Sequence, residues 1–285
     1  MTASKDSVTA FAPAKLNLCL HVTGQRPDGY HELDSLVMFA ATGDTITATL
    51  ADDLSLTIDG PFADSLSMEA DNLVLRAARL LDPDRGARIH LHKALPVAAG
   101  IGGGSSDAAA TLRALATLWD MPLPTAAEVL PLGADIPVCM HPGLLRMEGI
   151  GEALTPLGPA PMLDIVLVNP GIALSTPEVF KGLRCKDNPP LPGDMPDPFE
   201  IDSWVGWLAE QRNDLQEPAI AAAPVIGEVL EALDAQPGNQ LVRMSGSGAT
   251  CFGIFEDAAT RDAAAAAIRT ARPDWWVAAS EEWNL

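Results

Sequence analysis

The sequence is short of basic residues. Its 285 residues include 18 Lys and Arg against 38 Asp and Glu, which gives a formal net charge of -20. Nucleic acids and anionic lipid surfaces are themselves negative, so we expect neither as a partner. The same reasoning weighs against polyanionic small ligands such as ATP. That last inference stays open until the basic residues are located.

Long apolar runs and paired cysteines are also missing. The most apolar stretch, residues 162–174, is interrupted by Asp164, Asn169 and Pro170, whereas a membrane span needs roughly 18 or more apolar residues. The N-terminal segment has no apolar core that would mark a signal peptide. The four cysteines form no Cys-x-x-Cys pair, which argues against structural zinc and a disulfide framework. We therefore expect reduced thiols and a cytoplasmic location.

The composition, 48% apolar and 20% charged, is that of a globular protein. At roughly 150 residues per domain, the length suggests about two domains. Hydrophobic periodicity predicts strands over residues 15–22, 33–39, 46–50, 54–58, 89–91, 165–168, 249–255 and 275–278. The strands at 46–50 and 54–58 are expected to form a hairpin. Helices are predicted over residues 71–81, 105–119, 225–233 and 257–270, with another after Thr125. Because strands and helices mix without regular alternation, the fold class is α+β.

A glycine loop, Gly100 to Gly104, is the strongest local signal, and a helix is expected to start at Ser105 or Ser106. Glycine lets the backbone approach a ligand, and a helix N-terminus offers unpaired N–H groups to phosphate. The loop lacks the Gly-Lys-Ser/Thr of a Walker A motif. Ser105 replaces the third glycine of a dinucleotide-binding loop, and Asp120 does not follow a second strand. A phosphate site is therefore favoured over a tight turn, and an NAD oxidoreductase is disfavoured.

Two further places in the sequence carry side chains that could bind or deprotonate a hydroxyl group. Lys15 and Asn17 alternate on one strand face, roughly 6–7 Å apart, so one ligand could touch both. Asp135 lies between Gly133 and Pro137, which would hold a carboxylate in place as a general base. Taken alone, Lys15 is more often a solvated edge residue and Asp135 an ordinary helix cap.

Two short segments have a binding and a packing interpretation. Tyr30, the only tyrosine, and His31 follow a Pro-Asp-Gly turn at 27–29 and could stack on a planar base. The alternative is packing at the rim of the fold. The Ser245-Gly-Ser-Gly segment is either a second loop that approaches phosphate or a flexible turn.

Taken together, three segments resemble one family. Ala12-Pro-Ala-Lys-Leu-Asn-Leu, the 100–107 loop and Ser245-Gly-Ser-Gly occur in that order. They resemble the galactokinase, homoserine kinase, mevalonate kinase and phosphomevalonate kinase (GHMP) superfamily. The stretches LGADIPVC, STPEVF and MSGSGATCFG extend the resemblance over residues 11–277. Within the superfamily, the Gly-Tyr-His turn points to a cytidine substrate.

The resemblance implies a two-domain GHMP kinase fold. A domain like ribosomal protein S5 domain 2 would span residues 1–158, a ferredoxin-like domain would span 159–285, and the active site would lie in the cleft between them. The implied reaction is ATP-dependent phosphorylation of the 2-hydroxyl of a CDP-linked sugar alcohol in isoprenoid precursor biosynthesis. Mg²⁺ would accompany ATP, and the protein would be a monomer or a homodimer.

The resemblance also implies residue roles. Asp135 would take the proton of the hydroxyl, Lys15 would keep that carboxylate ionised, and Asn17 would position the hydroxyl. Ser106 is the candidate Mg²⁺ ligand. The ATP phosphates would lie on Pro96, Val97, Ala98, Ala99, Gly100, Ile101, Gly102, Gly103, Gly104, Ser105 and Ser106.

The cytosine ring would sit between Tyr30 and Phe180, with His31 hydrogen-bonding its edge. The site would be closed by Thr176, Ser245, Gly246, Ser247 and Gly248.

Two departures and the charge complete the expectations. Many family members have Gly-Ala-Gly-Leu at residues 98–101, and the proline-rich segment 187–198 matches no family landmark. No Lys or Arg stands between Ala94 and Leu112, so backbone N–H groups, a helix N-terminus and Mg²⁺ would supply the positive field. Lys15 is then the one basic side chain expected near the chemistry. The alternatives are another GHMP kinase, of homoserine or mevalonate type, and a non-catalytic nucleotide-binding protein.

Overall fold

The computed structural model describes residues 6–66, 71–141, 143–158, 161–197 and 200–283. The chain forms two compact units, each assembled from separate stretches. The first unit comprises residues 1–14, 43–97 and 102–141, and the second comprises 15–42, 98–101 and 142–285. The predicted domain boundary falls at residue 159, which lies outside the described residues, and it stays a prediction.

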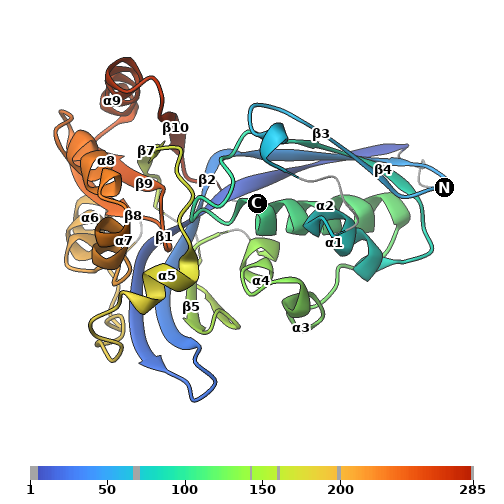
Figure 1. The fold of residues 1–285 in the computed structure, drawn as a ribbon, viewed down its shortest axis with the longest axis horizontal. Helices are drawn as coiled ribbons and strands as arrows, with labels where there is room; N and C mark the ends of the chain where they lie inside the picture. The colour runs from blue at the N-terminus through green and yellow to red at the C-terminus, as the bar shows by residue number, and fades with distance from the viewer. Residues whose placement is uncertain (1–5, 67–70, 142, 159–160, 198–199, 284–285) are drawn as a thin grey trace. The chain divides into compact units, whose positions relative to one another are not determined.

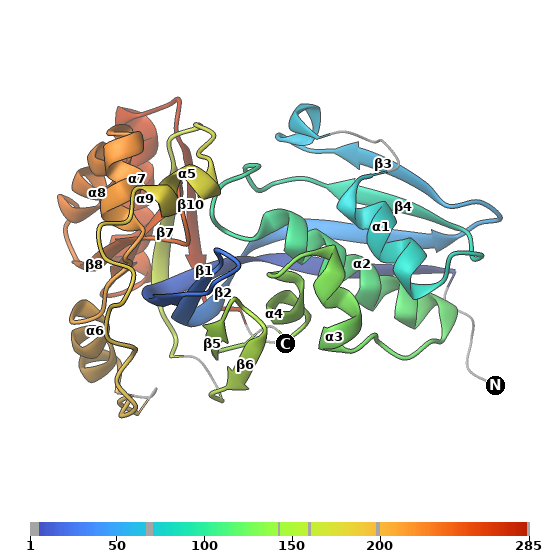
Figure 2. The same ribbon diagram turned by 60° about the horizontal axis from the view of Figure 1, so that its bottom comes forward.

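The first unit packs helices on a sheet (Figure 1). Strand β4 (Ala87–His92) pairs antiparallel with the second half of β2 (His31–Leu50) and parallel with β3 (Ser55–Asp59). Helices α1 (Leu73–Leu81) and α2 (Gly103–Trp119) lie side by side in both views (Figures 1 and 2). Their apolar faces and the strands form one core, which includes Ile46, Ile89, Leu91, Val74 and Leu115.

The predicted hairpin between residues 46–50 and 54–58 is wrong. Both segments are strands, but β4 lies between them. At Gly86, just before β4, an added Cβ would be only 2.3 Å from the Asp52 carbonyl oxygen. The chain entering β4 thus passes directly against the backbone of the expected hairpin turn.

Local capping signals set the remaining elements of this unit. Asn72, not Asp71, caps α1, since its Oδ1 accepts from the Val74 N–H at 2.9 Å. Helix α2 starts at Gly103, two residues before the earliest predicted start, and ends at Trp119 as predicted. The helix predicted after Thr125 is α3 (Ala126–Val129), and Thr125 forms a capping box with Glu128 at its start. Helix α4 (Ile136–Met140) and short 3₁₀ turns at Ala63–Ser65 and Leu130–Leu132 complete the unit.

The second unit is built on an antiparallel sheet with strand order β10-β7-β9-β8. These strands are β10 (Trp276–Glu281), β7 (Asp164–Asn169), β9 (Cys251–Phe255) and β8 (Asn239–Met244). Helices α8 (Val225–Asp234) and α9 (Ala258–Ala271) pack on this sheet. The unit also contains α5 (Thr176–Lys181), α6 (Ile201–Ala209), α7 (Gln216–Ala222), β5 (Leu145–Gly149) and β6 (Ala153–Pro156). Strand β5 pairs with the first half of β2.

Strands β1 (Ser7–Gln25) and β2 pair with each other and contribute residues to both units. The α+β class is confirmed. Every described helix is too short or too polar to cross a bilayer.

Candidate active site

Three of the predicted motifs meet in the second unit through hydrogen bonds. The Lys15 N–H donates to the Ile101 carbonyl at 2.9 Å. The Asn17 N–H donates to Ser245 Oγ at 3.1 Å, and that hydroxyl donates to the Gly100 carbonyl, also at 3.1 Å. We call this meeting of β1, the glycine loop and the Ser245 turn the three-motif junction.

Glycine is required at the junction because backbones approach closely there. A Cβ on Gly100 would lie 2.6 Å from the Gly248 carbonyl oxygen, and one on Gly246 would lie 2.9 Å from the Gly100 carbonyl oxygen. Both glycines also have positive φ, +74° and +56°, which L side chains rarely adopt. The Ser-Gly-Ser-Gly segment is therefore a tightly packed turn, and the interpretation as a flexible turn is wrong.

Ala98 has a left-handed backbone at a position where the resemblance implies glycine in many family members. Its φ is +54°, in the left-handed region that costs an alanine about 1–2 kcal/mol. The glycine loop thus keeps its left-handed turn at Ala98 at some cost in stability.

Lys15 and Asn17 are buried, with 4% and 1% of their surfaces exposed, so the interpretation of Lys15 as a solvated edge residue is wrong. Asn17 Nδ2 donates to Ser35 Oγ at 2.8 Å. Its Oδ1 is buried and accepts no hydrogen bond from the described residues.

The predicted base-binding residues also lie in the second unit. The rings of His31 and Phe180 stack at a centroid distance of 4.7 Å, whereas Tyr30 is 62% exposed. Burial, and then the positive charge of Lys186, lower the pKa of His31, which keeps its ring neutral at pH 7. His31 Nε2 is buried without a partner among the described residues. Thr176 joins the Ser245 turn through a 2.8 Å hydrogen bond with Ser247.

In the first unit, α2 begins beside a buried charged cluster that the sequence did not reveal. Lys93 Nζ donates to Asp107 Oδ2 at 2.7 Å and to Asp44 Oδ2 at 2.5 Å, and all three side chains are at most 4% exposed. Lys93 Nζ also lies 3.2 Å from the Cβ position of Gly103, the first residue of α2. The expectation that Lys15 is the one basic side chain near the chemistry is therefore corrected.

Charges within this cluster oppose one another. Burial disfavours the ammonium, but the two carboxylates outweigh it and raise the pKa of Lys93. Burial also raises the pKa of Asp107, and the Asp44 carboxylate adds to that effect, while Lys93 counters it. Because two carboxyl groups face one ammonium, the cluster supplies little net positive charge to the start of α2.

A pocket of about 300 Å³ opens beside the first turn of α2. Asp107 lines it, and the Oδ1 atom of Asp107 is buried without a partner among the described residues. The other lining residues are Leu66, Asp71, Asn72, Leu73, Val74, Leu91 and Gly104. The pocket thus combines apolar walls with a carboxyl oxygen that has no hydrogen-bond partner among the described residues.

Two further predicted site residues, Ser106 and Asp135, lie in the first unit. Ser106 is fully buried, and its hydroxyl donates to the Pro13 carbonyl at 2.7 Å; its role as a Mg²⁺ ligand stays a prediction. Asp135 stands at the N-cap of α4, yet its side chain makes no capping hydrogen bond. The expected cap position is thus found, without the side-chain hydrogen bond of a usual cap. Asp135 belongs to the first unit and Lys15 to the second, so their pairing stays a prediction.

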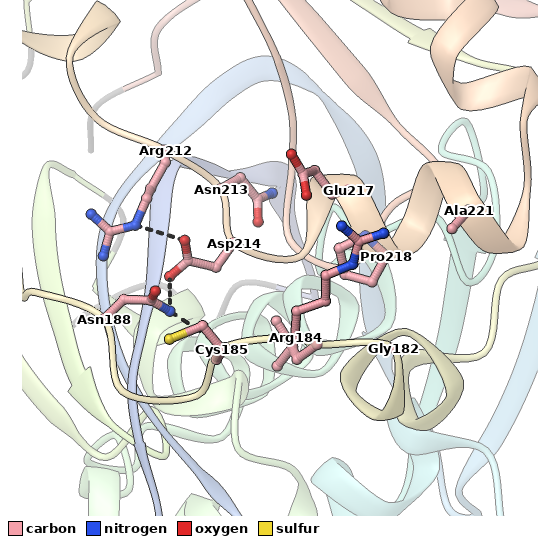
Figure 3. A pocket seen from close by; sticks show the side chains of 11 residues that line it. Gly182, Arg184, Cys185, Asn188, Arg212, Asn213, Asp214, Glu217, Pro218 and Ala221 are labelled. Atoms are coloured by element: carbon pink, nitrogen blue, oxygen red, sulfur yellow. Dashed lines mark hydrogen bonds and ion pairs between the residues drawn. The ribbon is translucent and has the colours of Figure 1, made fainter.

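A second pocket contains none of the predicted residues. This pocket of about 410 Å³ lies by the end of α5 and the start of α7 (Figure 3). Within it, Asp214 accepts from Arg212 Nε at 2.6 Å and from Asn188 Nδ2 at 3.1 Å. The Asn188 N–H donates to the Val22 carbonyl, so these contacts fasten the proline-rich segment 187–197 to β1. Pro198 lies outside the described residues.

Comparison with known proteins identifies the family. The model of the GHMP kinases N terminal domain matches residues 72–144, and that of the GHMP kinases C terminal domain matches residues 200–274. A relative from Ruegeria pomeroyi is 58% identical over 95% of this chain and 98% of its own length. One from Cereibacter sphaeroides is 59% identical over 94% and 97%. The chain belongs to the GHMP kinases, a family of small-molecule kinases.

Both relatives are named 4-diphosphocytidyl-2-C-methyl-D-erythritol kinase. A crystal structure of 4-(cytidine 5'-diphospho)-2C-methyl-D-erythritol kinase matches with a TM-score of 0.81 and 33% identity, over 97% of this chain and all of the other. Homoserine kinase from Cytophaga hutchinsonii matches with a TM-score of 0.66 at 16% identity, over 99% of this chain and 97% of the other. That second match shows a shared fold alone.

Proposed function

We propose that this chain transfers the γ-phosphoryl group of ATP to the 2-hydroxyl of 4-(cytidine 5'-diphospho)-2-C-methyl-D-erythritol. The products would be the 2-phosphate and ADP, on the non-mevalonate route to isoprenoid precursors. The names of relatives at 58% and 59% identity support this substrate. The structural observation that carries the proposal is the three-motif junction, which ties Lys15 to Ile101 and ties Asn17, through Ser245, to Gly100 of the glycine loop.

ATP would bind at the first turn of α2. Its N–H groups, from Gly103 onward, and the positive end of the helix dipole suit phosphates. The pocket beside Gly104 suits a purine, because Leu73 and Leu91 offer apolar contact and the Oδ1 atom of Asp107 has no hydrogen-bond partner among the described residues. The acidic surface does not oppose this, since backbone groups do most of the binding.

Mg²⁺ would accompany ATP and neutralise charge on its phosphates. In nucleotide sites Mg²⁺ is held by one or two carboxylates together with the phosphates. Within the described part of the chain, no group of three or more His, Cys, Asp or Glu side chains is arranged to hold a metal. The phosphates would be the principal ligands of the ion.

The residues of the chain would act by positioning and by proton transfer, which is what phosphoryl transfer chiefly needs. Asp135 would accept the proton of the 2-hydroxyl, and its carboxylate is not used to cap α4. Lys15 would hold that carboxylate ionised and polarise the hydroxyl. Asn17 would orient the alcohol.

The cytosine ring would be recognised at Phe180 and His31. A neutral imidazole can donate or accept a hydrogen bond, and His31 Nε2 is buried without a partner among the described residues. Tyr30, largely exposed, would cover the bound ring. Homoserine and mevalonate have no base to stack, so these residues favour the cytidine substrate over the other GHMP reactions.

The test is ADP release from Mg-ATP with each of three acceptors: the cytidine alcohol, homoserine and mevalonate. We expect turnover with the cytidine alcohol and at least about 100-fold lower kcat/KM with the others, which is about 2.7 kcal/mol of discrimination. Preference for homoserine or mevalonate would indicate another GHMP kinase. Saturable ATP binding without ADP release from any acceptor would indicate a non-catalytic nucleotide-binding protein.

A further inference from the structure

The side-chain amide of Asn17 belongs to a short buried hydrogen-bond chain that no substrate contact explains. Asn17 Nδ2 donates to Ser35 Oγ at 2.8 Å, and Ser35 Oγ donates to the Cys19 carbonyl at 2.6 Å. Ser35 is fully buried and Asn17 is 1% exposed. Because water cannot easily replace these partners, each proton of this hydrogen-bond chain is assigned to one donor and one acceptor.

The number of protons in this hydrogen-bond chain determines which end of the Asn17 side-chain amide faces Ser35. A serine hydroxyl carries one proton, and that of Ser35 goes to the Cys19 carbonyl. Ser35 Oγ can therefore only accept from Asn17. An amide turned by 180° would set its oxygen against an acceptor and leave both groups unsatisfied.

The same geometry directs Asn17 Oδ1 toward the three-motif junction. Oδ1 lies 3.3 Å from the Cβ position of Gly246, and it has no hydrogen-bond partner among the described residues. Buried acceptors without a partner are uncommon in proteins. The orphan oxygen is thus held ready for a donor that arrives with a ligand.

We propose that Ser35 is a positioning residue of this kinase: it locks the Asn17 amide so that Oδ1 accepts a hydrogen bond from a hydroxyl of the sugar alcohol. This inference rests on the proposed function. It assigns Asn17 as an acceptor, which selects for a hydroxyl at that place in the substrate. It gives Ser35, which touches no substrate, a role that acts through Asn17.

The kinetic test is a double-mutant cycle with Ser35→Ala, Asn17→Ala and the double variant, measured with the cytidine alcohol and ATP. Removing the Ser35 hydroxyl should lower kcat/KM for the alcohol by roughly 10- to 100-fold, with the KM for ATP unchanged. In the Asn17→Ala background, Ser35→Ala should change kcat/KM by less than about two-fold, because residues that act through one another are not additive. An equal loss in both backgrounds would overturn the proposal.

Two variants distinguish the orienting effect of Ser35 on the Asn17 amide from a general loss of structure. Ser280→Ala is the matched control: Ser280 is also buried on a strand of the second unit and donates to a backbone carbonyl, that of Glu281. It should leave kcat/KM unchanged. Ser35→Thr keeps the hydroxyl and should recover most of the activity lost in Ser35→Ala. A folded Ser35→Thr variant as slow as Ser35→Ala would contradict the role of the hydroxyl.

A second readout does not depend on the substrate. In ¹⁵N spectra, the side-chain NH₂ signal that Asn17→Ala lacks should exchange slowly with solvent in the wild type and faster in Ser35→Ala. An exchange rate in Ser35→Ala equal to that in the wild type would overturn the proposal that Ser35 orients Asn17. If the wild type released no ADP with the cytidine alcohol, the proposed function would fail while this measurement still decided whether Ser35 orients Asn17.

Discussion

Replacing Lys93 with Met would test whether the buried charged cluster supports the start of α2. Met has a similar length, so the substitution leaves little cavity. It removes the ammonium that forms ion pairs with Asp44 and Asp107, whose side chains are 0% and 4% exposed. Removing one partner of a buried ion pair costs about 3–5 kcal/mol, so we expect a loss of that size in the free energy of unfolding at pH 8.

The loss should depend on pH in a definite direction. A carboxyl group whose pKa is higher in the folded than in the unfolded protein stabilises the fold while protonated. That stabilisation is fully present below the unfolded pKa and disappears as pH rises through the folded pKa. Burial, aided by Asp44, already raises the pKa of Asp107 from 3.8 to about 8. Without Lys93 this rise would be larger, so the variant should lose least near about pH 5 and most near about pH 8.

Urea unfolding of the wild type and Lys93→Met at both pH values measures this difference. Lys186→Met is the matched control, because Lys186 donates to Gln25 near the surface and its removal should cost within about 0.5 kcal/mol. A loss below about 1 kcal/mol for Lys93→Met, or the same loss at both pH values, would refute this account of the cluster.

Four further changes test other parts of the account. Asp135→Asn should lose at least about 100-fold in kcat while ATP binding, measured by calorimetry, stays normal; turnover within a few-fold of wild type would exclude the base role. Tyr30→Ala should raise the KM for the cytidine alcohol and spare that for ATP; an unchanged KM would argue against base stacking. Gly246→Ala should reduce kcat/KM at least roughly 10-fold, because the new Cβ would meet the Gly100 carbonyl oxygen at 2.9 Å and adopt positive φ; full activity would show that the junction tolerates a side chain. Ala98→Gly should raise the free energy of unfolding by about 1 kcal/mol by relieving the left-handed alanine, and a loss of stability would contradict that.

Short-range signals predicted several of the individual elements. Alternation marked the middle of β1, and the helix after Thr125 and the end of α2 at Trp119 were predicted from local sequence. The start of α2 was set two residues late because Gly103 and Gly104 are poor helix formers. Here the packing of α2 against α1 and the sheet outweighs that low propensity.

Local sequence patterns do not predict which strands pair or which distant residues come into contact. The hairpin expected around residue 52 failed because β4, some 30 residues later, pairs between β2 and β3. Lys93 directly precedes the 94–112 segment, which contains no Lys or Arg. Only the fold brings its side chain to Gly103. Ser35 carried no motif at all, since its role depends on a hydrogen bond to a different strand.

The measurement that tests the central claim most directly is identification of the product. The chain would be incubated with Mg-ATP and 4-(cytidine 5'-diphospho)-2-C-methyl-D-erythritol, and the products followed by ³¹P NMR. The account predicts one new phosphomonoester on the 2-hydroxyl for each ADP formed. ADP without a phosphorylated alcohol, or phosphate on another hydroxyl, would contradict it.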